Sequence, residues 1–255
     1  MTLITGRVKK DGKIYTVLLE NGKIYEATGD IGSGLVRTDR EFARQEISFV
    51  APVEPKKIVA VGKNYFAHIQ EFDANVPESP IIFLKPSTAV IGPNEEIIRP
   101  SISQRVDYEG EMALVVKKRA RNVKAADYKD YVLGYTILND VTARDLQFAD
   151  GQWTRGKGFD TFAPIGPVIT DEVDPEHLSI QTKLNGVAVQ DSNTEKFIFS
   201  LGEIFAFVTR FTTLEPGDVL TTGTPEGVGP MVDGDVVEIT IDGIGTLRNT
   251  VRDEQ

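Results

Sequence analysis

Short apolar runs recur along the chain from Lys57 onward, and glycine, proline or asparagine bounds each of them. The runs cover residues 58–61, 81–84, 112–116, 133–138 and 165–169. Runs of this length between turn-forming residues are typical of buried strands. Two hairpin patterns follow, one around Asn185-Gly186 and one around Asp242-Gly243. The sequence therefore predicts a β-rich core, rolled or barrel-like, because so many short strands must bury both faces.

Helix signals are few. The strongest covers residues 201–211, where Ser200 precedes the apolar stretch and Glu203 follows three residues later, which is the spacing of a capping box. Shorter helices are predicted over residues 65–72, 125–131 and 142–149. Many strands with a few helices make this a mainly β chain of the α+β class.

The first fifty residues carry a near-repeat, Gly12-Lys13-Ile14-Tyr15 and Gly22-Lys23-Ile24-Tyr25. Each copy follows Asp or Asn, and Asp-Gly and Asn-Gly are the preferred dipeptides of tight hairpin turns. The repeat predicts neighbouring strands of one meander. Residues 51–55, rich in proline, read as a connector. We therefore expect a small N-terminal β domain over residues 1–52 and a larger domain over residues 53–255.

Charge and composition exclude several classes of protein. The 255 residues include 28 Lys and Arg against 38 Asp and Glu, a formal charge of −10, which disfavours nucleic acids and anionic membranes as partners. The chain has no cysteine, so disulfides and thiolate metal sites are excluded. No signal-peptide stretch and no membrane-spanning run is found, so a cytoplasmic location is expected.

Three carboxylates stand at strand ends. Glu109, Gly110 and Glu111 enter an apolar run, and Asp140 follows a second run at residues 132–139. Residues i and i+2 of a strand share a face, and two carboxylates on a buried face repel unless a cation neutralises them. Oxygen ligands without histidine or cysteine suit Mg²⁺, Mn²⁺ or Ca²⁺. The alternative is an exposed strand face on which the pair forms salt bridges to lysine or arginine.

Two further groups could carry chemistry. His68 and Glu71 are three residues apart in a predicted helix, so the carboxylate can orient the imidazole as a base. Lys157 lies between two glycines and could reach a substrate oxygen. The alternatives are a surface pair and an exposed loop lysine. His177 lies in a polar loop and receives no role, and the glycine-rich segment 221–229 could hold an anion or simply connect two strands.

Taken in chain order, these segments resemble the fumarylacetoacetate hydrolase family. The matching motifs are Gly62-Lys63-Asn64-Tyr65 with His68 and Glu71, residues 83–88, Glu109-Gly110-Glu111, residues 139–147, 157–161, 164–167 and 222–229. Together they span about three quarters of the chain, residues 57–251. Lys63 stands where many relatives carry arginine, which holds a carboxylate with a different geometry.

The resemblance implies a mixed β-sandwich roll core behind a small N-terminal β domain, and a homodimer. It implies that Glu109, Glu111 and Asp140 bind Mg²⁺ or Mn²⁺. His68 and Glu71 would form a catalytic dyad on a short lid that orders when ligand binds. Lys157 would polarise the substrate. The residues implied to bind substrate are Lys63, Tyr65, Lys85, Arg144, Gln147 and Thr224.

The implied reaction begins with the enolate of a 2-oxo acid, stabilised by the metal and by Lys157. Three outcomes are open from there. Water activated by His68 and Glu71 can hydrolyse a carbon–carbon bond of an acylpyruvate or a fumarylacetoacetate-like diketone. Loss of a carboxylate decarboxylates oxaloacetate. Return of a proton at another carbon isomerises 2-hydroxyhepta-2,4-diene-1,7-dioate, an intermediate of aromatic catabolism. A binding homologue without activity would be expected to lack one of the site residues.

Overall fold

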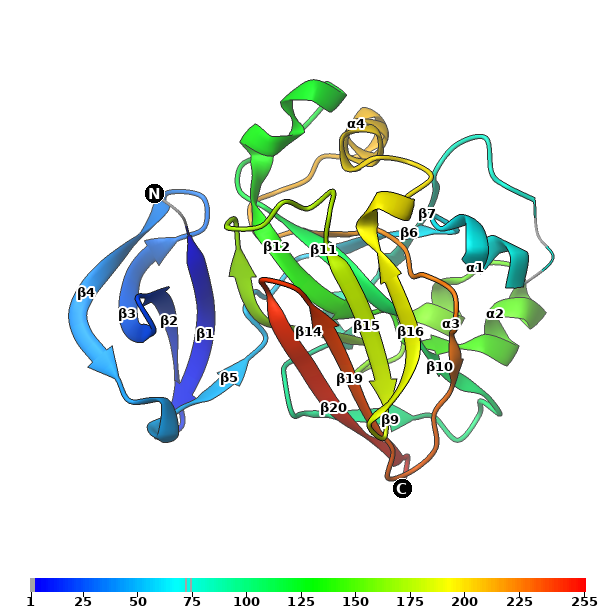
Figure 1. The fold of residues 1–255 in the computed structure, drawn as a ribbon, viewed down its shortest axis with the longest axis horizontal. Helices are drawn as coiled ribbons and strands as arrows, with labels where there is room; N and C mark the ends of the chain where they lie inside the picture. Colours follow the sequence, from blue (N-terminus) through cyan, green and yellow to red (C-terminus); the bar gives the residue numbers. More distant parts are fainter. Residues whose placement is uncertain (1–2, 72, 74) are drawn as a thin grey trace.

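Strands dominate the computed structural model, which describes residues 3–71, 73 and 75–255 (Figure 1). The strands of the largest sheet are β1 (Ile4–Lys10), β2 (Lys13–Glu20), β3 (Lys23–Asp30), β4 (Gly34–Phe42), β5 (Ser48–Val50), β6 (Ile58–Gly62), β7 (Ile81–Lys85), β8 (Val90–Ile91), β11 (Gly110–Val116), β12 (Val132–Asn139), β14 (Ala163–Thr170) and β17 (Val219–Thr221). Their order is β4-β3-β2-β1-β14-β12-β11-β17-β6-β7, with β5 paired to β1 and β8 to β14.

Two smaller sheets complete the β structure. One contains β9 (Glu96–Arg99), β15 (Ser179–Leu184), β16 (Val187–Asn193), β19 (Val236–Ile241) and β20 (Gly245–Asp253). The other contains β10 (Val106–Tyr108), β13 (Thr142–Ala143) and β18 (Gly229–Pro230). The sheet of β15, β19 and β20 lies across β11, β12 and β14, so every residue of β11 is buried. This packing confirms the predicted β-rich α+β fold.

The helices are short apart from one. They are α1 (Phe66–Glu71), α2 (Arg144–Asp150), α3 (Thr154–Lys157) and α4 (Leu201–Phe211), with 3-10 turns η1 (Arg44–Glu46), η2 (Ser87–Ala89), η3 (Ala125–Tyr131) and η4 (Thr194–Lys196). α4 has the predicted bounds, and its capping box of Ser200 and Glu203 is confirmed. Within the described ranges, no helix has the length and apolarity needed to cross a membrane.

Three of the predicted shorter helices differ from the structure. Residues 125–131 form a 3-10 helix. The helix predicted over 142–149 begins only at Arg144, because the Thr142 and Ala143 backbones pair with β10 as strand β13. The helix predicted over 65–72 is observed as α1, and its predicted last residue, Phe72, lies outside the described residues.

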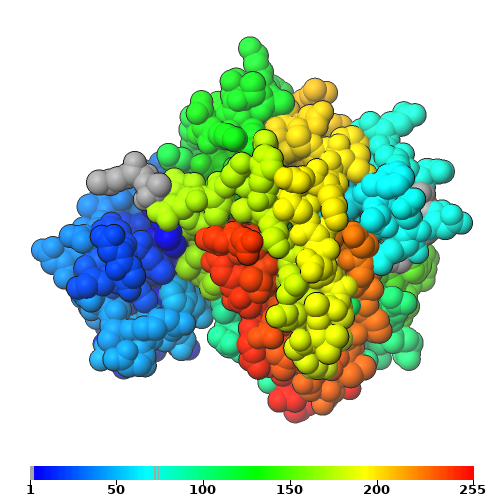
Figure 2. All heavy atoms as spheres, in the orientation of Figure 1, coloured from blue at the N-terminus to red at the C-terminus, as the bar shows by residue number. Residues whose placement is uncertain are grey.

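The N-terminal strands form the predicted meander and make a lobe at one end of the molecule (Figure 2). Both Asp11-Gly12 and Asn21-Gly22 have positive φ at each residue, as type I′ hairpin turns require. The lobe has its own apolar cluster, formed by Val8, Val17, Ile24, Phe42 and Ile47. β1 also pairs with β14, which joins the lobe to the largest sheet. The boundary at residues 52 and 53 stays a prediction, and residues 1 and 2 lie outside the described residues.

Candidate metal and catalytic centre

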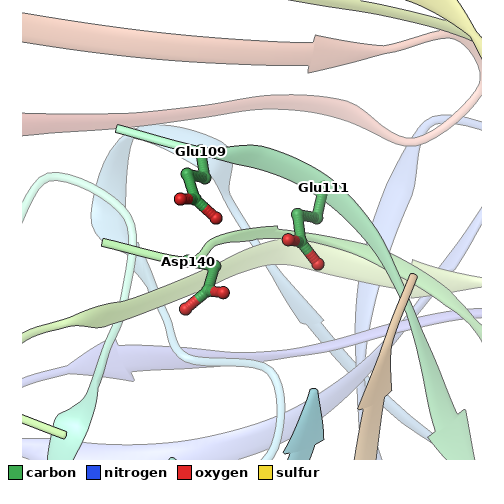
Figure 3. Close-up of side chains that lie close together, drawn as sticks. All are labelled: Glu109, Glu111 and Asp140. Atoms are coloured by element: carbon green, nitrogen blue, oxygen red, sulfur yellow. The ribbon is translucent and has the colours of Figure 1, made fainter. Parts of the chain in front are cut away.

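Glu109, Glu111 and Asp140 lie together in the interior (Figure 3), and one carboxylate oxygen of each lies within 4.8 Å of those of the other two. The expectation that one continuous strand carries both glutamates is wrong, because the strand breaks at Glu109, between β10 and β11. The Glu109 amide donates to the Asn139 side-chain oxygen, and the Glu109 carbonyl accepts from the Asp140 amide, each at 2.9 Å. The end of β12 therefore fixes this break and brings the three carboxylates together.

Gly110 lets the two large sheets approach behind these carboxylates. Its amide donates to Oε1 of Gln190 at 3.1 Å. A Cβ at position 110 would collide with the hydroxyl of Thr182, on the facing sheet. The glycine between the two glutamates is thus required by packing, and any larger residue would push the site apart.

Three buried cations neutralise Glu109 and Asp140. Lys157 Nζ lies 2.8 Å from Glu109 Oε2 and 2.6 Å from Asp140 Oδ2. Arg144 binds the other Glu109 oxygen at 2.5 Å, and Lys85 binds the other Asp140 oxygen at 2.6 Å. Burial alone would raise the pKa of Glu109, but Lys157 and Arg144 hold it well below its ordinary value. Glu109 is therefore ionised at neutral pH.

Glu111 is different, because its charge has no such partner. It is 1 % exposed and accepts a hydrogen bond from the Gly223 amide at 2.9 Å, and no ion pair to it is present in the described part of the chain. Burial, together with the charges of Asp140 and Glu109, raises its pKa well above the ordinary value. A buried carboxylate of this kind takes up either a proton or a cation.

The residues present fit a divalent metal ion. The donors are carboxylate oxygens, which Mg²⁺ and Mn²⁺ prefer, and among the described residues no ion pair neutralises Glu111. The alternative of an exposed strand face is wrong, because all three side chains are buried, although Glu109 does form the salt bridges to lysine and arginine that this alternative included.

His68 and Glu71 form the predicted contact within α1. Nδ1 of His68 lies 3.1 Å from Oε2 of Glu71, and the amide of Gly227 donates to Oε1 of Glu71 at 2.7 Å. Burial lowers the pKa of His68, although Glu109 and Glu71 oppose this effect. The imidazole is therefore neutral at pH 7. The carboxylate at Nδ1 favours the tautomer with the proton there, so that Nε2 carries the lone pair of a base.

The start of α1 is held by Asn64, which is fully buried. Its side-chain amide donates to the Thr222 carbonyl at 2.9 Å, and its side-chain oxygen accepts from the Phe199 amide at 2.8 Å. Lys63, just before it, has a left-handed φ of 58°. These contacts turn the chain sharply from β6 into α1 and point the helix toward the carboxylates.

A cavity of about 250 Å³ opens beside these groups. Eight of the predicted site residues line it, namely Lys63, His68, Glu109, Glu111, Arg144, Gln147, Lys157 and Thr224. Asp140, Glu71, Tyr65 and Lys85 are not among its described lining residues. Lys85 instead binds Asp140 from behind, and the ring of Tyr65 packs on Phe197 with centroids 5.1 Å apart. Two of the three clustered carboxylates, Glu109 and Glu111, therefore face the same cavity as His68.

The glycine-rich segment 221–229 binds the protein's own acids. The Gly223 and Gly227 amides hold Glu111 and Glu71, and the Thr224 hydroxyl donates to the Gly110 carbonyl at 3.0 Å. The segment thus positions the carboxylates of the site. The sequence alone had left its role open between binding an anion and simply connecting two strands.

Sequence reasoning missed two parts of the site. Asp107 is fully buried and accepts from Arg144 at 2.9 Å, which orients the guanidinium. Its position two residues before Glu109 was an available signal. Phe148 and Trp153 form an apolar part of the cavity wall. Nothing local in the sequence marks them, because they meet the cavity only through the packing of α2 and α3 beside β7.

Comparisons with known proteins find relatives over most of the chain. The family profile described as fumarylacetoacetate (FAA) hydrolase C-terminal matches residues 57–252. The mitochondrial oxaloacetate tautomerase Fahd2a of Rattus norvegicus is 44 % identical over 220 residues, which cover 82 % of this chain and 70 % of the rat protein. The 2-hydroxyhepta-2,4-diene-1,7-dioate isomerase of Mycobacterium marinum is 40 % identical with a TM-score of 0.92 over 99 % of both chains.

A third relative was solved with ligands. The fumarylpyruvate hydrolase of Pseudomonas aeruginosa, in complex with Mn²⁺ and pyruvate, is 33 % identical with a TM-score of 0.76, covering 85 % of this chain and 93 % of that one.

Proposed function

The chain belongs to the fumarylacetoacetate hydrolase family, and we propose that it is a divalent-metal-dependent enzyme acting on 2-oxo acids. The proposed reaction is carbon–carbon hydrolysis of an acylpyruvate or fumarylacetoacetate-like diketo acid, or isomerisation of a 2-hydroxyhepta-2,4-diene-1,7-dioate. One observation carries the proposal: Glu109, Glu111 and His68 face the same cavity. A relative that binds Mn²⁺ and pyruvate supports the choice of ligands.

The proposed reaction needs a bound metal ion and a positive charge beside the substrate. Glu109, Glu111 and Asp140 would hold Mg²⁺ or Mn²⁺, which when bound supplies Lewis acidity toward the oxygens of a 2-oxo acid. Lys157, fixed by Glu109 and Asp140, places a positive charge beside the cavity, where the enolate's negative charge develops.

His68 supplies the proton transfer. Its Nδ1 is held by Glu71, so Nε2 can take a proton from water as that water attacks the distal carbonyl. The same nitrogen can return the proton to the leaving carbon. This role favours hydrolysis or isomerisation over plain decarboxylation, which needs no attacking water.

Oxaloacetate is the second candidate substrate, by tautomerisation or decarboxylation. The rat relative, named as an oxaloacetate tautomerase, favours it. An inactive binding homologue is a weaker alternative, because the sequence lacks none of the expected metal ligands or dyad residues.

The decisive experiment is a panel assay of the purified protein with Mg²⁺, with Mn²⁺ and with EDTA. The substrates are acetylpyruvate, fumarylpyruvate, oxaloacetate and a 2-hydroxyhepta-2,4-diene-1,7-dioate. We expect metal-dependent turnover of at least one of them, inhibited by oxalate as a mimic of the pyruvate enolate. Turnover unaffected by EDTA, or no turnover and no metal-dependent thermal shift with oxalate, would contradict the proposal.

Metal affinity should rise with pH. The metal competes with the proton on Glu111, whose pKa is raised by burial and by its acidic neighbours. Below the raised pKa each ion bound displaces a proton, so affinity increases with pH and levels off above that pKa. Calorimetric titrations in two buffers of different ionisation enthalpy measure the protons released. No proton release at any pH, with an affinity that does not change with pH, would show that another group limits binding.

Phe148 should select for apolar substrate tails. It lies at the mouth of the cavity and is 64 % exposed, so Phe148→Ala should leave the fold intact. Loss of this contact should raise KM for acylpyruvates with longer acyl chains by about fivefold, from about 1 kcal/mol of apolar contact, and leave KM for oxaloacetate unchanged. Phe211→Ala, at a similarly exposed position at the end of α4, is the control. Equal changes in KM for acylpyruvates and for oxaloacetate would show that Phe148 does not select for apolar substrate tails.

The homodimer implied by the resemblance is also proposed. Light scattering coupled to gel filtration tests it, with an expected mass of twice the chain's 28.1 kDa.

A further inference from the structure

The dyad helix α1 depends on contacts from outside itself. It has six residues, and a helix of that length is not stable alone. Asn64 holds its start, and at its end Glu71 accepts the amide of Gly227 at 2.7 Å. The other oxygen of Glu71 faces His68 Nδ1. The position of the Gly227 amide therefore decides where the Glu71 carboxylate points.

Tyr108 contacts the peptide group on the other side of Gly227, between Gly227 and Val228. The hydroxyl of Tyr108 donates to the Gly227 carbonyl at 2.9 Å, and Tyr108 is 3 % exposed. Gly227 has a φ of 93°, and a Cβ there would collide with the Val189 carbonyl. The Gly227 backbone is thus confined by Val189, its carbonyl accepts from the Tyr108 hydroxyl, and its amide donates to Glu71.

The hydroxyl is well placed for this role. Tyr108 pairs with Gly229 across β10 and β18, and a Cβ at Gly229 would lie 2.8 Å from the Tyr108 oxygen, so only glycine leaves it room. Tyr108 also directly precedes Glu109, so the residue that supports the dyad is next in the chain to a proposed metal ligand.

We propose that Tyr108 is a positioning residue for the catalytic dyad, acting through the backbone of Gly227 on Glu71 and thereby on His68. Tyr108 is not among the described residues that line the cavity, so the proposed role is indirect. A residue that merely filled the core would instead stabilise β10 and β18, without a particular effect on α1.

Hydrogen exchange separates these two roles without any assay of activity. In Tyr108→Phe, we expect the amides of α1 to exchange about tenfold faster than in the wild type, while those of β10 and β18 stay unchanged. Tyr15→Phe, in the N-terminal lobe, is the matched control and should alter neither region. Unchanged exchange in α1, or an equal increase in α1, β10 and β18, would overturn the proposal.

A second comparison, which rests on the proposed function, uses kinetics. Tyr108→Phe should lower kcat of the dyad-dependent reaction about tenfold, with KM and metal affinity unchanged. Added to Glu71→Ala, it should cause no further loss beyond about twofold, because Glu71 is its only route to His68. Losses that multiply would show that Tyr108 acts elsewhere. If the wild type turns over no substrate in the panel, the proposed function fails, while hydrogen exchange still decides the role of Tyr108.

Discussion

Glu111→Gln should lower kcat/KM by at least about a thousandfold and at the same time raise the melting temperature of the metal-free protein. The loss follows because a metal ligand is removed, and the Lewis acidity it supports is worth several kcal/mol of transition-state stabilisation. The gain follows because Glu111 is a buried acid whose pKa is raised by burial and by Asp140 and Glu109. Glutamine keeps the volume and removes the charge.

The pH dependence of that gain has a definite sign. A carboxyl group with a raised pKa in the folded state destabilises the protein as pH rises from its unfolded pKa to its folded pKa. The wild type without metal should therefore lose stability over this window, and Glu111→Gln should not. Thermal melts with EDTA at pH 5 and pH 8 measure the difference, which we expect to be larger at pH 8.

Glu109→Gln is the matched comparison and should have the opposite effect on stability. Glu109 binds both Lys157 and Arg144, so its loss leaves two buried cations short of a partner. Breaking a buried ion pair in this way costs about 3–5 kcal/mol, or roughly 10 °C in a chain of this size. Both variants should lose activity. If both lower the melting temperature of the metal-free protein equally, Glu111 is not the uncompensated carboxylate of the site.

The contrast between the two glutamates could not be predicted from the sequence. Strand geometry is a local rule, and it was enough to predict that Glu109 and Glu111 share a face. That Asp140 completes a metal site with them was implied by the resemblance to the family. Which carboxylate receives Lys157 and Arg144 depends on α2 and α3, which reach the cluster only in the folded chain. The break at Glu109 was missed for the same reason, since Asn139 and Asp140 impose it from another strand.

In the fold, too, features set by local sequence patterns were predicted, and features set by distant contacts were missed. The N-terminal turns and the α4 capping box follow from short sequence patterns, so their positions were predicted closely. The helix predicted over residues 142–149 failed at its start because Thr142 pairs with Asp107 in β10, and pairing between distant strands leaves no local pattern. The support of Glu71 by Gly227 was hidden likewise, as the two residues are 156 positions apart.

His68→Ala should reduce carbon–carbon hydrolysis by about 10²- to 10⁴-fold, the usual contribution of a general base, while metal binding stays unchanged. The imidazole accepts the water's proton only if it is neutral at the working pH, and burial lowers its pKa so that it is. His177→Ala is a matched control, since His177 is the only other histidine, is exposed and pairs with Asp174 away from the cavity. It should have no effect on turnover.

His68→Ala also separates the two candidate functions when it is assayed on oxaloacetate. Decarboxylation of oxaloacetate needs the enolate to be stabilised by the metal and Lys157, but needs no activated water, so His68→Ala should largely spare it. Lys157→Met should instead reduce both reactions, because the charge it removes serves the step they share. Equal loss of hydrolysis and decarboxylation in His68→Ala would show that the dyad also moves a proton in enolate formation. Its action would then belong to the common step rather than to the attack of water.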